Sequence, residues 1–301
     1  MLRAALVLSV LASGCVAGNM AAGALLLPMR VPVVGDPSVG HESFSVTTRD
    51  GIALDGWLFT PVATPRAVMI FVHGKDINRQ HFVGAARRFL DEGIAVVAFD
   101  QRAHGRSTGE FVTYGAREVG DLRLVIDVAL KKWGRQLPVV LVGESLGAAV
   151  ALQTAAVEPR VRVVVAGAAF ADLTTVIDDH APFFLSAEAK MKAVQVAEQA
   201  ADFHVADISP ERSARTITVP TLLLHGAEDT YLPIKHSVRI FEELAGPKRL
   251  VILEGVDHIG ILSNDAAWKA IDRFVDESLA QDALAKPASS TAVAGARTTS
   301  R

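Results

Sequence analysis

A serine flanked by glycines, in Gly143-Glu144-Ser145-Leu146-Gly147, is the stretch of the 301-residue sequence that points most directly to chemistry. The stretch follows the apolar run PVVLV and precedes AAVALQTAA, which predicts a sharp turn between a strand and a helix. Glycines two residues before and two residues after the serine remove side chains that would collide in such a turn. The serine hydroxyl is then exposed at the start of a helix, which suits a nucleophile.

A serine hydroxyl is a weak nucleophile, so it needs a base, and the base needs an acid to orient it. For a serine on this kind of turn, the acid and then a histidine follow later in the chain. Asp229 lies in LLLHGAEDTYLP after one predicted strand, and His258 lies in VILEGVDHIGIL after the next. We therefore predict a catalytic triad of Ser145, His258 and Asp229, which performs acyl transfer.

Other residues compete for the roles of base and acid. The alternative bases are His73, His104, His225 and His236. Two of them, His73 and His225, precede a glycine at a strand end, where packing is the usual role. The alternative acids are Asp172, Glu228 and Asp257, and Asp257 is disfavoured because neighbouring side chains in a loop rarely orient each other.

Strands and helices alternate along most of the chain, and this predicts an α/β fold. A hairpin around Asp50-Gly51 is followed by predicted strands at 67–74, 94–100, 138–143, 161–168, 219–226 and 248–255. Predicted helices lie at 79–92, 115–133, 145–157, 235–245 and 265–281. We expect a mostly parallel eight-stranded sheet with helices on both faces and functional residues at the carboxyl ends of its strands. Residues 171–215 interrupt the alternation and predict a small helical lid insertion.

Five stretches resemble the α/β-hydrolase superfamily, over roughly residues 43–280: FVHG (71–74), DQRAHGRSTG (100–109), GESLG (143–147), LLHGAEDTYLP (223–233) and DHIG (257–260). They look like the branch of serine hydrolases related to Bem46-like and serine-aminopeptidase-like proteins. The resemblance implies an α/β-hydrolase fold with Ser145 as nucleophile, His258 as general base and acid, and Asp229 as the orienting acid. Some members place the acid after the sixth strand, which would select Asp172 instead.

The resemblance also implies an oxyanion hole, in which backbone N–H groups stabilise the negative charge of the intermediate. Its donors would be the N–H groups of Leu146, which follows the nucleophile, and of Lys75, which follows His-Gly in HGKDINR. Gly74 is the alternative to Lys75 if the loop is rotated. The loop residues Asp100, Arg102 and Ser107 are expected to brace the site rather than to react.

The first 15 residues, MLRAALVLSVLASGC, have the shape of a secretory signal, with one positive charge, an apolar core and small residues at the end. The lone cysteine, Cys15, resembles the lipidated cysteine of bacterial lipoproteins. We therefore expect a lipoprotein of the bacterial cell envelope, anchored to the membrane. An uncleaved apolar helix over residues 4–27 and plain secretion are the alternatives.

Composition sets the remaining expectations. We expect a linker at 16–40, a single hydrolase domain at 41–282 and a disordered tail at 283–301. One cysteine excludes an intramolecular disulfide, and a net charge of −3 without a basic run gives no sign of nucleic-acid binding. The nine histidines show no metal-binding spacing, so we expect no metal and no cofactor.

The function predicted from the sequence is hydrolysis of a small-molecule ester, or another acyl substrate, by a serine carboxylesterase. A peptidase or acyltransferase using the same triad is one alternative, and a non-catalytic binding module is another, because this type of fold also hosts binding functions. Dehalogenation is disfavoured, since that chemistry requires aspartate at the position of Ser145. The sequence leaves the acyl and leaving groups open.

Overall fold

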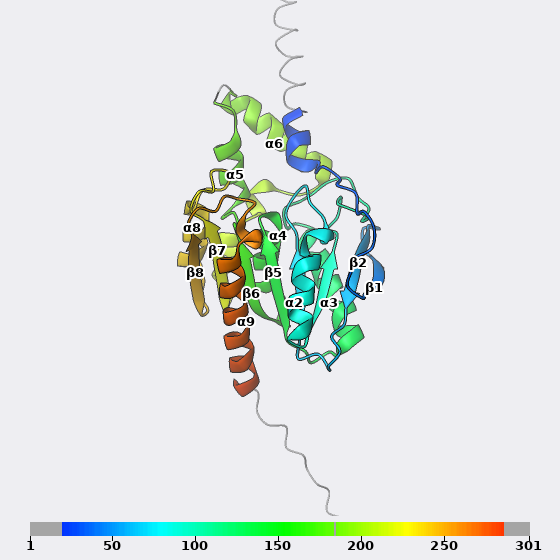
Figure 1. The fold of residues 1–301 in the computed structure, drawn as a ribbon. Helices are drawn as coiled ribbons and strands as arrows, with labels where there is room; N and C mark the ends of the chain where they lie inside the picture. The colour runs from blue at the N-terminus through cyan, green and yellow to red at the C-terminus, as the bar shows by residue number, and fades with distance from the viewer. Residues whose placement is uncertain (1–19, 184, 286–301) are drawn as a thin grey trace, which may run out of the picture.

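The computed structural model describes residues 20–183 and 185–285, which form one eight-stranded sheet with helices on both faces (Figure 1). The expected fold class is thereby confirmed. The strands are β1 (Glu42–Thr47), β2 (Ala53–Phe59), β3 (Ala67–Val72), β4 (Ile94–Phe99), β5 (Val139–Glu144), β6 (Val161–Gly167), β7 (Thr221–Gly226) and β8 (Lys248–Leu253). Their order in the sheet is β1-β2-β4-β3-β5-β6-β7-β8.

The sheet is parallel from β4 to β8, and only β1 and β2 are antiparallel to their neighbours among the described strands. Every residue of β3, β4, β5 and β7 is buried. Their continuous apolar sequences are therefore those of strands covered by helices on both faces. The edge strand β1 is largely exposed, and the other edge strand, β8, is exposed at its first two residues. Both carry charged residues at exposed positions, such as Glu42 and Lys248, which discourage pairing with another sheet.

Two hydrophobic clusters lie on opposite faces of the sheet. Along β3, Val68, Ile70 and Val72 join one cluster, whereas Met69 and Phe71 join the other, because successive side chains of a strand point to opposite faces. The first cluster packs against α3 (Glu118–Trp133), α4 (Leu146–Ala155) and α8 (Lys235–Glu243). The second packs against α2 (Val83–Asp91) and α9 (Asp265–Ala285). A helical turn, η1 (Arg79–Phe82), leads into α2.

The predicted lid region contains α5 (Leu173–His180), α6 (Ala187–Ala201), η2 (Val205–Asp207) and α7 (Pro210–Ala214). Figure 1 shows α5 and α6 above the carboxyl ends of the strands. Ion pairs join α5 to α8, with Asp179 Oδ1 2.7 Å from Lys235 Nζ and Asp172 Oδ2 2.7 Å from Arg239 Nη2. The helix α7 instead packs against α4 and α8, so α5 and α6 form the part of this region that covers the sheet end.

Residues 20–34, which fall within the range expected to be a linker, lie against the domain. Residues 20–26 are helical and lie beside α6 at the top of Figure 1. Ala22 and Leu26 are 3% and 2% exposed and belong to the first hydrophobic cluster. The Arg30 guanidinium donates hydrogen bonds to the carbonyls of Ser107 and Gly109, which holds the segment that follows. The predictions for residues 1–15, which include Cys15, and for residues 286–301 lie outside the described residues. Residues 283–285, predicted to begin the disordered tail at 283–301, belong instead to α9.

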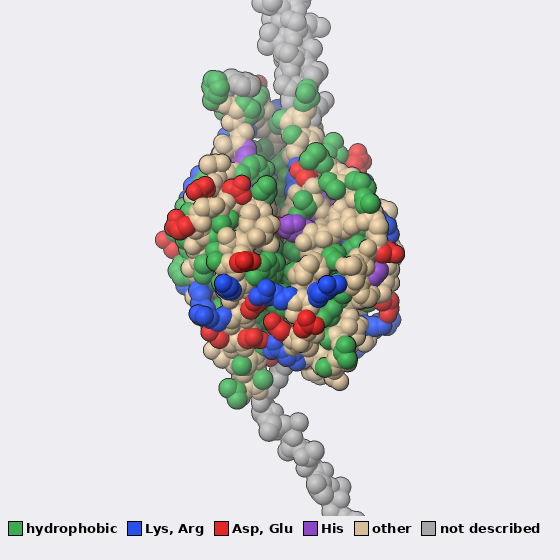
Figure 2. Space-filling model, viewed as in Figure 1, with side chains coloured by type: hydrophobic (Ala, Val, Ile, Leu, Met, Phe, Trp, Pro, Cys, Tyr) green, Lys and Arg blue, Asp and Glu red, His purple; other side chains and the backbone are tan. Residues whose placement is uncertain are grey.

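Within residues 20–183 and 185–285, no helix is long and apolar enough to cross a membrane. Lys and Arg side chains form a band across the lower part of the face in Figure 2, far from the end that carries α6.

Candidate active site

Ser145 sits on a strained turn between β5 and α4. Its φ of 53° and ψ of −117° are unfavourable for a residue with a side chain, and its N–H donates to the Gly167 carbonyl at 2.8 Å. A Cβ added to Gly147 would lie 1.9 Å from the Val72 carbonyl oxygen, and one added to Gly143 would lie 2.4 Å from the Gly147 carbonyl oxygen. Both glycines are therefore required by the close approach of backbone to backbone, as the sequence predicts.

The structure brings Ser145, His258 and Asp229 together in one chain of hydrogen bonds. The Ser145 hydroxyl lies 2.9 Å from His258 Nε2, and His258 Nδ1 lies 2.7 Å from Asp229 Oδ2. The carboxylate must accept from Nδ1–H, so Nε2 is left free to accept the serine proton. These distances are those of a base positioned on a nucleophile and oriented by an acid.

Asp229 is held as a carboxylate by donors on two sides. Its side chain is fully buried, and besides His258 it accepts from the N–H groups of Tyr231 at 3.0 Å and Leu232 at 2.8 Å. Burial disfavours its charge, but the hydrogen bonds from His258 and Leu232 outweigh this effect and lower its pKa below the ordinary value. The Leu232 carbonyl in turn accepts from His225 Nε2 at 2.7 Å, which fixes the loop that carries Asp229.

Leu146, the first predicted oxyanion donor, follows Ser145 in the chain, and Lys75, the second, lies in the loop after β3. Leu146 is the first residue of α4, where backbone N–H groups have no partner within the helix. Among the hydrogen bonds of the described residues, neither the Leu146 N–H nor the Lys75 N–H has an acceptor in the protein. A Cβ added to Gly74 would lie 3.5 Å from Ser145 Cβ, so the residue that precedes Lys75 lies close to the nucleophile.

The alternative histidines use both ring nitrogens for structural contacts. The His73 ring lies 2.7 Å from the Gly74 carbonyl and accepts from the Gln101 N–H at 3.0 Å, and burial lowers its pKa. The two ring nitrogens of His104 are hydrogen-bonded to backbone groups. Those of His225 are hydrogen-bonded to the Ser237 hydroxyl and the Leu232 carbonyl. Those of His236 are hydrogen-bonded to the Ala171 N–H and the Asp179 carboxylate. None of these rings is hydrogen-bonded to Ser145 within the part of the chain that the structure describes.

The alternative acids have other roles as well. Asp172 caps α5 by accepting from the Thr175 N–H at 2.8 Å, and it is paired with Arg239. Asp257 accepts from the Gly260 N–H at 3.0 Å, and Glu228 is exposed.

The loop from Asp100 to Ser107 braces the site, as the sequence predicts. Asp100 is buried and accepts from the N–H groups of Arg79 at 2.9 Å and Arg106 at 2.8 Å. The sequence reasoning missed Arg79, whose fully buried guanidinium pairs with Asp55 at 2.5 Å. Asp55, Arg79 and Asp100, which are far apart in the sequence, thus form one charge network, and no local sequence pattern indicates it.

A cavity of about 370 Å³ is connected to the triad through Tyr231, which contacts the His258 ring, although none of the three triad residues lines the cavity. Lys75 lines it, and so does Tyr231, whose ring lies 4.9 Å from the His258 ring and 4.4 Å from the His180 ring, centroid to centroid. The sequence reasoning missed Tyr231, although its place two residues after the predicted acid could have signalled a role. The other lining residues come from the helical segment 20–26, from Tyr114 and from the α5–α6 region.

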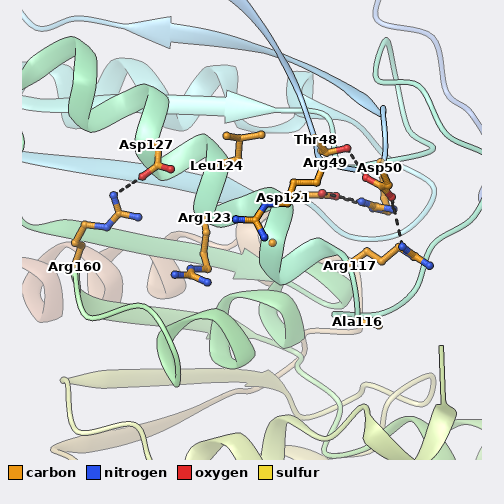
Figure 3. Close-up of a pocket in the computed structure, with 12 residues that line it drawn as sticks. Thr48, Arg49, Asp50, Ala116, Arg117, Asp121, Arg123, Leu124, Asp127 and Arg160 are labelled. Atoms are coloured by element: carbon orange, nitrogen blue, oxygen red, sulfur yellow. Dashed lines mark hydrogen bonds and ion pairs between the residues drawn. The ribbon is translucent and has the colours of Figure 1, made fainter. Parts of the chain in front are cut away.

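A second cavity, of about 410 Å³, lies along α3 and has a different character (Figure 3). Its arginines are largely neutralised within the protein: Arg102 by Asp121 and Asp50, and Arg160 by Asp127 at 2.5 Å. None of the triad residues lines it, and neither Tyr231 nor Lys75 connects it to the triad. We therefore assign it no part in catalysis, and the described residues contain no cluster of three His, Cys, Asp or Glu side chains that could hold a metal ion.

The sheet order and the serine turn are those of the α/β-hydrolase fold, and comparisons with known proteins agree with this fold. Residues 63–204 match the family of serine aminopeptidases, S33. The chain is similar to the uncharacterised protein YqkD of Bacillus subtilis, at 27% identity over 78% of this chain and 79% of that protein. It is also 32% identical to a monoacylglycerol lipase of Mycolicibacterium smegmatis, over 36% of this chain and 38% of the lipase.

Among solved structures, the esterase Pf2001 of Pyrococcus furiosus matches with a TM-score of 0.68 at 22% identity, covering 84% of this chain and 99% of the esterase. At this level of identity the match speaks for the fold. The chain therefore has the α/β-hydrolase fold, and residues 63–204, slightly less than half of the chain, match the serine aminopeptidase family.

Proposed function

We propose that the protein hydrolyses carboxylic esters through an acyl-enzyme formed on Ser145. The observation that carries the proposal is the hydrogen-bonded chain from the Ser145 hydroxyl through His258 to the buried Asp229. Relatives and structural neighbours that include a lipase and an esterase support the same class of reaction.

In the proposed reaction, the Ser145 oxygen attacks the ester carbonyl while His258 Nε2 takes the serine proton. The Asp229 carboxylate stabilises the imidazolium that forms and keeps the ring in the required orientation. His258 then gives its proton to the departing alcohol. Water, activated by the same nitrogen, attacks the acyl-enzyme and releases the carboxylic acid and free Ser145.

The N–H groups of Leu146 and Lys75 are the proposed donors to the oxyanion of both tetrahedral intermediates. Both lack protein acceptors among the described residues. Leu146 follows Ser145 directly, and Gly74, the residue before Lys75, lies close to Ser145. Loss of one such donor costs about 3 kcal/mol of transition-state stabilisation. A strained serine turn beside N–H groups that have no protein acceptor argues against a purely binding function, because binding alone does not require such an arrangement.

The test is the hydrolysis of p-nitrophenyl esters from acetate to palmitate by the full-length chain, its Ser145→Ala variant and a Ser263→Ala control. Ser263 is exposed on η3 (Ile261–Ser263) and lies outside the triad. We expect Ser145→Ala to lower kcat by about a thousandfold or more and Ser263→Ala to leave it unchanged. Turnover that does not depend on Ser145 would refute the proposal.

A peptidase is the second candidate, because residues 63–204 match the serine aminopeptidase family. Aminoacyl p-nitroanilides assayed beside the esters separate the two functions. Ser145-dependent hydrolysis of the anilides without hydrolysis of the esters would favour the peptidase.

For location, we propose the bacterial cell envelope, with a membrane anchor at the N-terminus. The support is the sequence of residues 1–15, with its apolar core and Cys15. Fractionation of cells that express Cys15→Ala tests the lipid anchor: release from the membrane supports it, and continued retention supports an apolar helix as the anchor.

A further inference from the structure

We infer that the helical segment 20–26 is one wall of the acyl-binding pocket and sets which acyl chains the enzyme accepts. This inference rests on the proposed function. The cavity that Tyr231 connects to His258 lies between this segment and α6. Ala21, Ala24 and Leu25 line it from one side, and Ala193 and Val194 line it from the other. Figure 1 shows the two helices next to each other above the sheet.

The segment has two faces, and each has a defined neighbour. Ala22 and Leu26, one helical turn apart, are buried in the core cluster. Ala21 and Leu25, also one turn apart, face the cavity. Burial of the first face therefore fixes the rotation of the helix and determines which side chains reach the pocket.

Three hydrogen bonds hold the carboxyl end of the segment. Lys75 Nζ donates to the Ala24 carbonyl at 2.8 Å, the Tyr114 hydroxyl donates to the Leu25 carbonyl at 2.7 Å, and the Val112 N–H donates to the Leu26 carbonyl at 2.9 Å. These carbonyls belong to the last turn of a helix, where partners within the helix are missing. The side chain of Lys75 thus positions the wall.

The pocket has the chemistry of a site for an uncharged hydrocarbon chain. Most of its lining side chains are apolar, and none of the described lining residues is a carboxylate. Of its two lysines, Lys190 is paired with Asp178 at 2.5 Å and Lys75 is tied to the Ala24 carbonyl. The volume of about 370 Å³ lies toward the small end of ligand pockets, which favours short and medium acyl chains.

The test alters the wall from inside the pocket and from outside it. Ala24→Phe fills the cavity, whereas Met20→Phe is the matched control, because Met20 is 72% exposed and does not line the pocket. For Ala24→Phe, we expect the ratio of kcat/KM for p-nitrophenyl octanoate to that for the acetate ester to fall about tenfold or more. Met20→Phe should keep the wild-type ratio.

Leu25→Ala enlarges the cavity, so its ratio should shift the other way, toward longer chains. It provides an independent test if the Phe variant does not fold, which circular dichroism would reveal. An unchanged ratio in a folded Ala24→Phe or Leu25→Ala variant would overturn the inference while leaving the proposed function intact.

Binding of octanoate, the product, measured by calorimetry, separates the inference from catalysis. We expect the full-length wild type to bind octanoate and Ala24→Phe to bind it about tenfold more weakly or worse, even if ester turnover fails. Absence of octanoate binding to the wild type, or equal affinity in both proteins, would refute the pocket wall. Loss of ester turnover with binding intact would refute only the proposed function.

Discussion

Asp229 is held by more contacts than its hydrogen bond to His258 alone, since the N–H groups of Tyr231 and Leu232 also donate to it. We expect Asp229→Asn to preserve the shape of the site but to lower kcat by about 10³- to 10⁴-fold, because an amide neither fixes the tautomer of His258 nor stabilises its positive charge. Ester turnover measures the effect. Glu228→Gln, at the exposed neighbouring position, is the control and should keep the wild-type kcat. Equal kcat values for Asp229→Asn and the wild type would show that Asp229 is not the orienting acid.

Glu158 is a second carboxylate whose charge the fold favours. Arg160 and Arg123 donate to it, and these hydrogen bonds lower its pKa from 4.5 to about 2 against the opposing effect of burial. A lowered pKa in the folded state means that the charge stabilises the fold above pH 4.5 and that this contribution is lost as the pH falls toward 2.

We expect Glu158→Gln to lower the free energy of unfolding by about 2 kcal/mol at pH 7, and by progressively less below pH 4.5. Urea denaturation at pH 7, 4.5 and 3 measures the difference from the wild type. Glu254→Gln, at an exposed position, should show little effect at any of these pH values. A Glu158→Gln deficit that stays constant down to pH 3 would contradict the pKa assignment.

At this scale, the sequence predicts residues whose role depends on a local pattern. Ser145 could be predicted because the turn itself requires the flanking glycines, and Asp229 and His258 because each follows a strand in a known order. Tyr231 and Arg79 could not be predicted in the same way, since their roles depend on partners brought close only by folding, such as His258 and Asp55.

The turn between β5 and α4 is the element on which the site depends most. Gly147→Ala would place a Cβ 1.9 Å from the Val72 carbonyl oxygen, so we expect a loss of about 3 kcal/mol or more in unfolding free energy, together with loss of activity. Gly84→Ala in α2 is the matched control, because its Cβ would meet nothing within 4 Å. Thermal and urea unfolding should show this control unchanged or stabilised by up to about 1 kcal/mol. A stable, active Gly147→Ala protein would refute the close approach.

Among the elements, periodicity predicts the strands and helices of the sheet well, because buried parallel strands have continuous apolar sequences. The predicted helix at 79–92 divides into η1 and α2, and the last helix extends to Ala285. The placement of residues 20–34 was not predictable, since their small and apolar side chains suit a leader, a linker or a packed helix equally. The packed helix is held by hydrogen bonds from Lys75 and Tyr114, which are distant in the sequence and come close only in the folded chain.

For the whole molecule, the packing of residues 20–26 makes the N-terminal segment part of the domain core. We expect Leu26→Ala to lower the free energy of unfolding by about 2–4 kcal/mol, because Leu26 is 2% exposed in the main cluster. Leu27→Ala, its neighbour at 48% exposure, should change it by less than about 0.5 kcal/mol. Equal effects of the two substitutions, measured by chemical denaturation, would show that the segment does not contribute to the core.

The separation of the triad along the chain also determines when activity can begin during synthesis. Ser145 and His258 are 113 residues apart, and the base arrives on the loop after β8, the last strand of the sheet. At about 5–20 residues per second, a ribosome needs roughly 6–23 s to pass from one to the other. During this interval the nascent chain holds the proposed nucleophile without its base, so an unfinished chain cannot carry out the proposed ester hydrolysis.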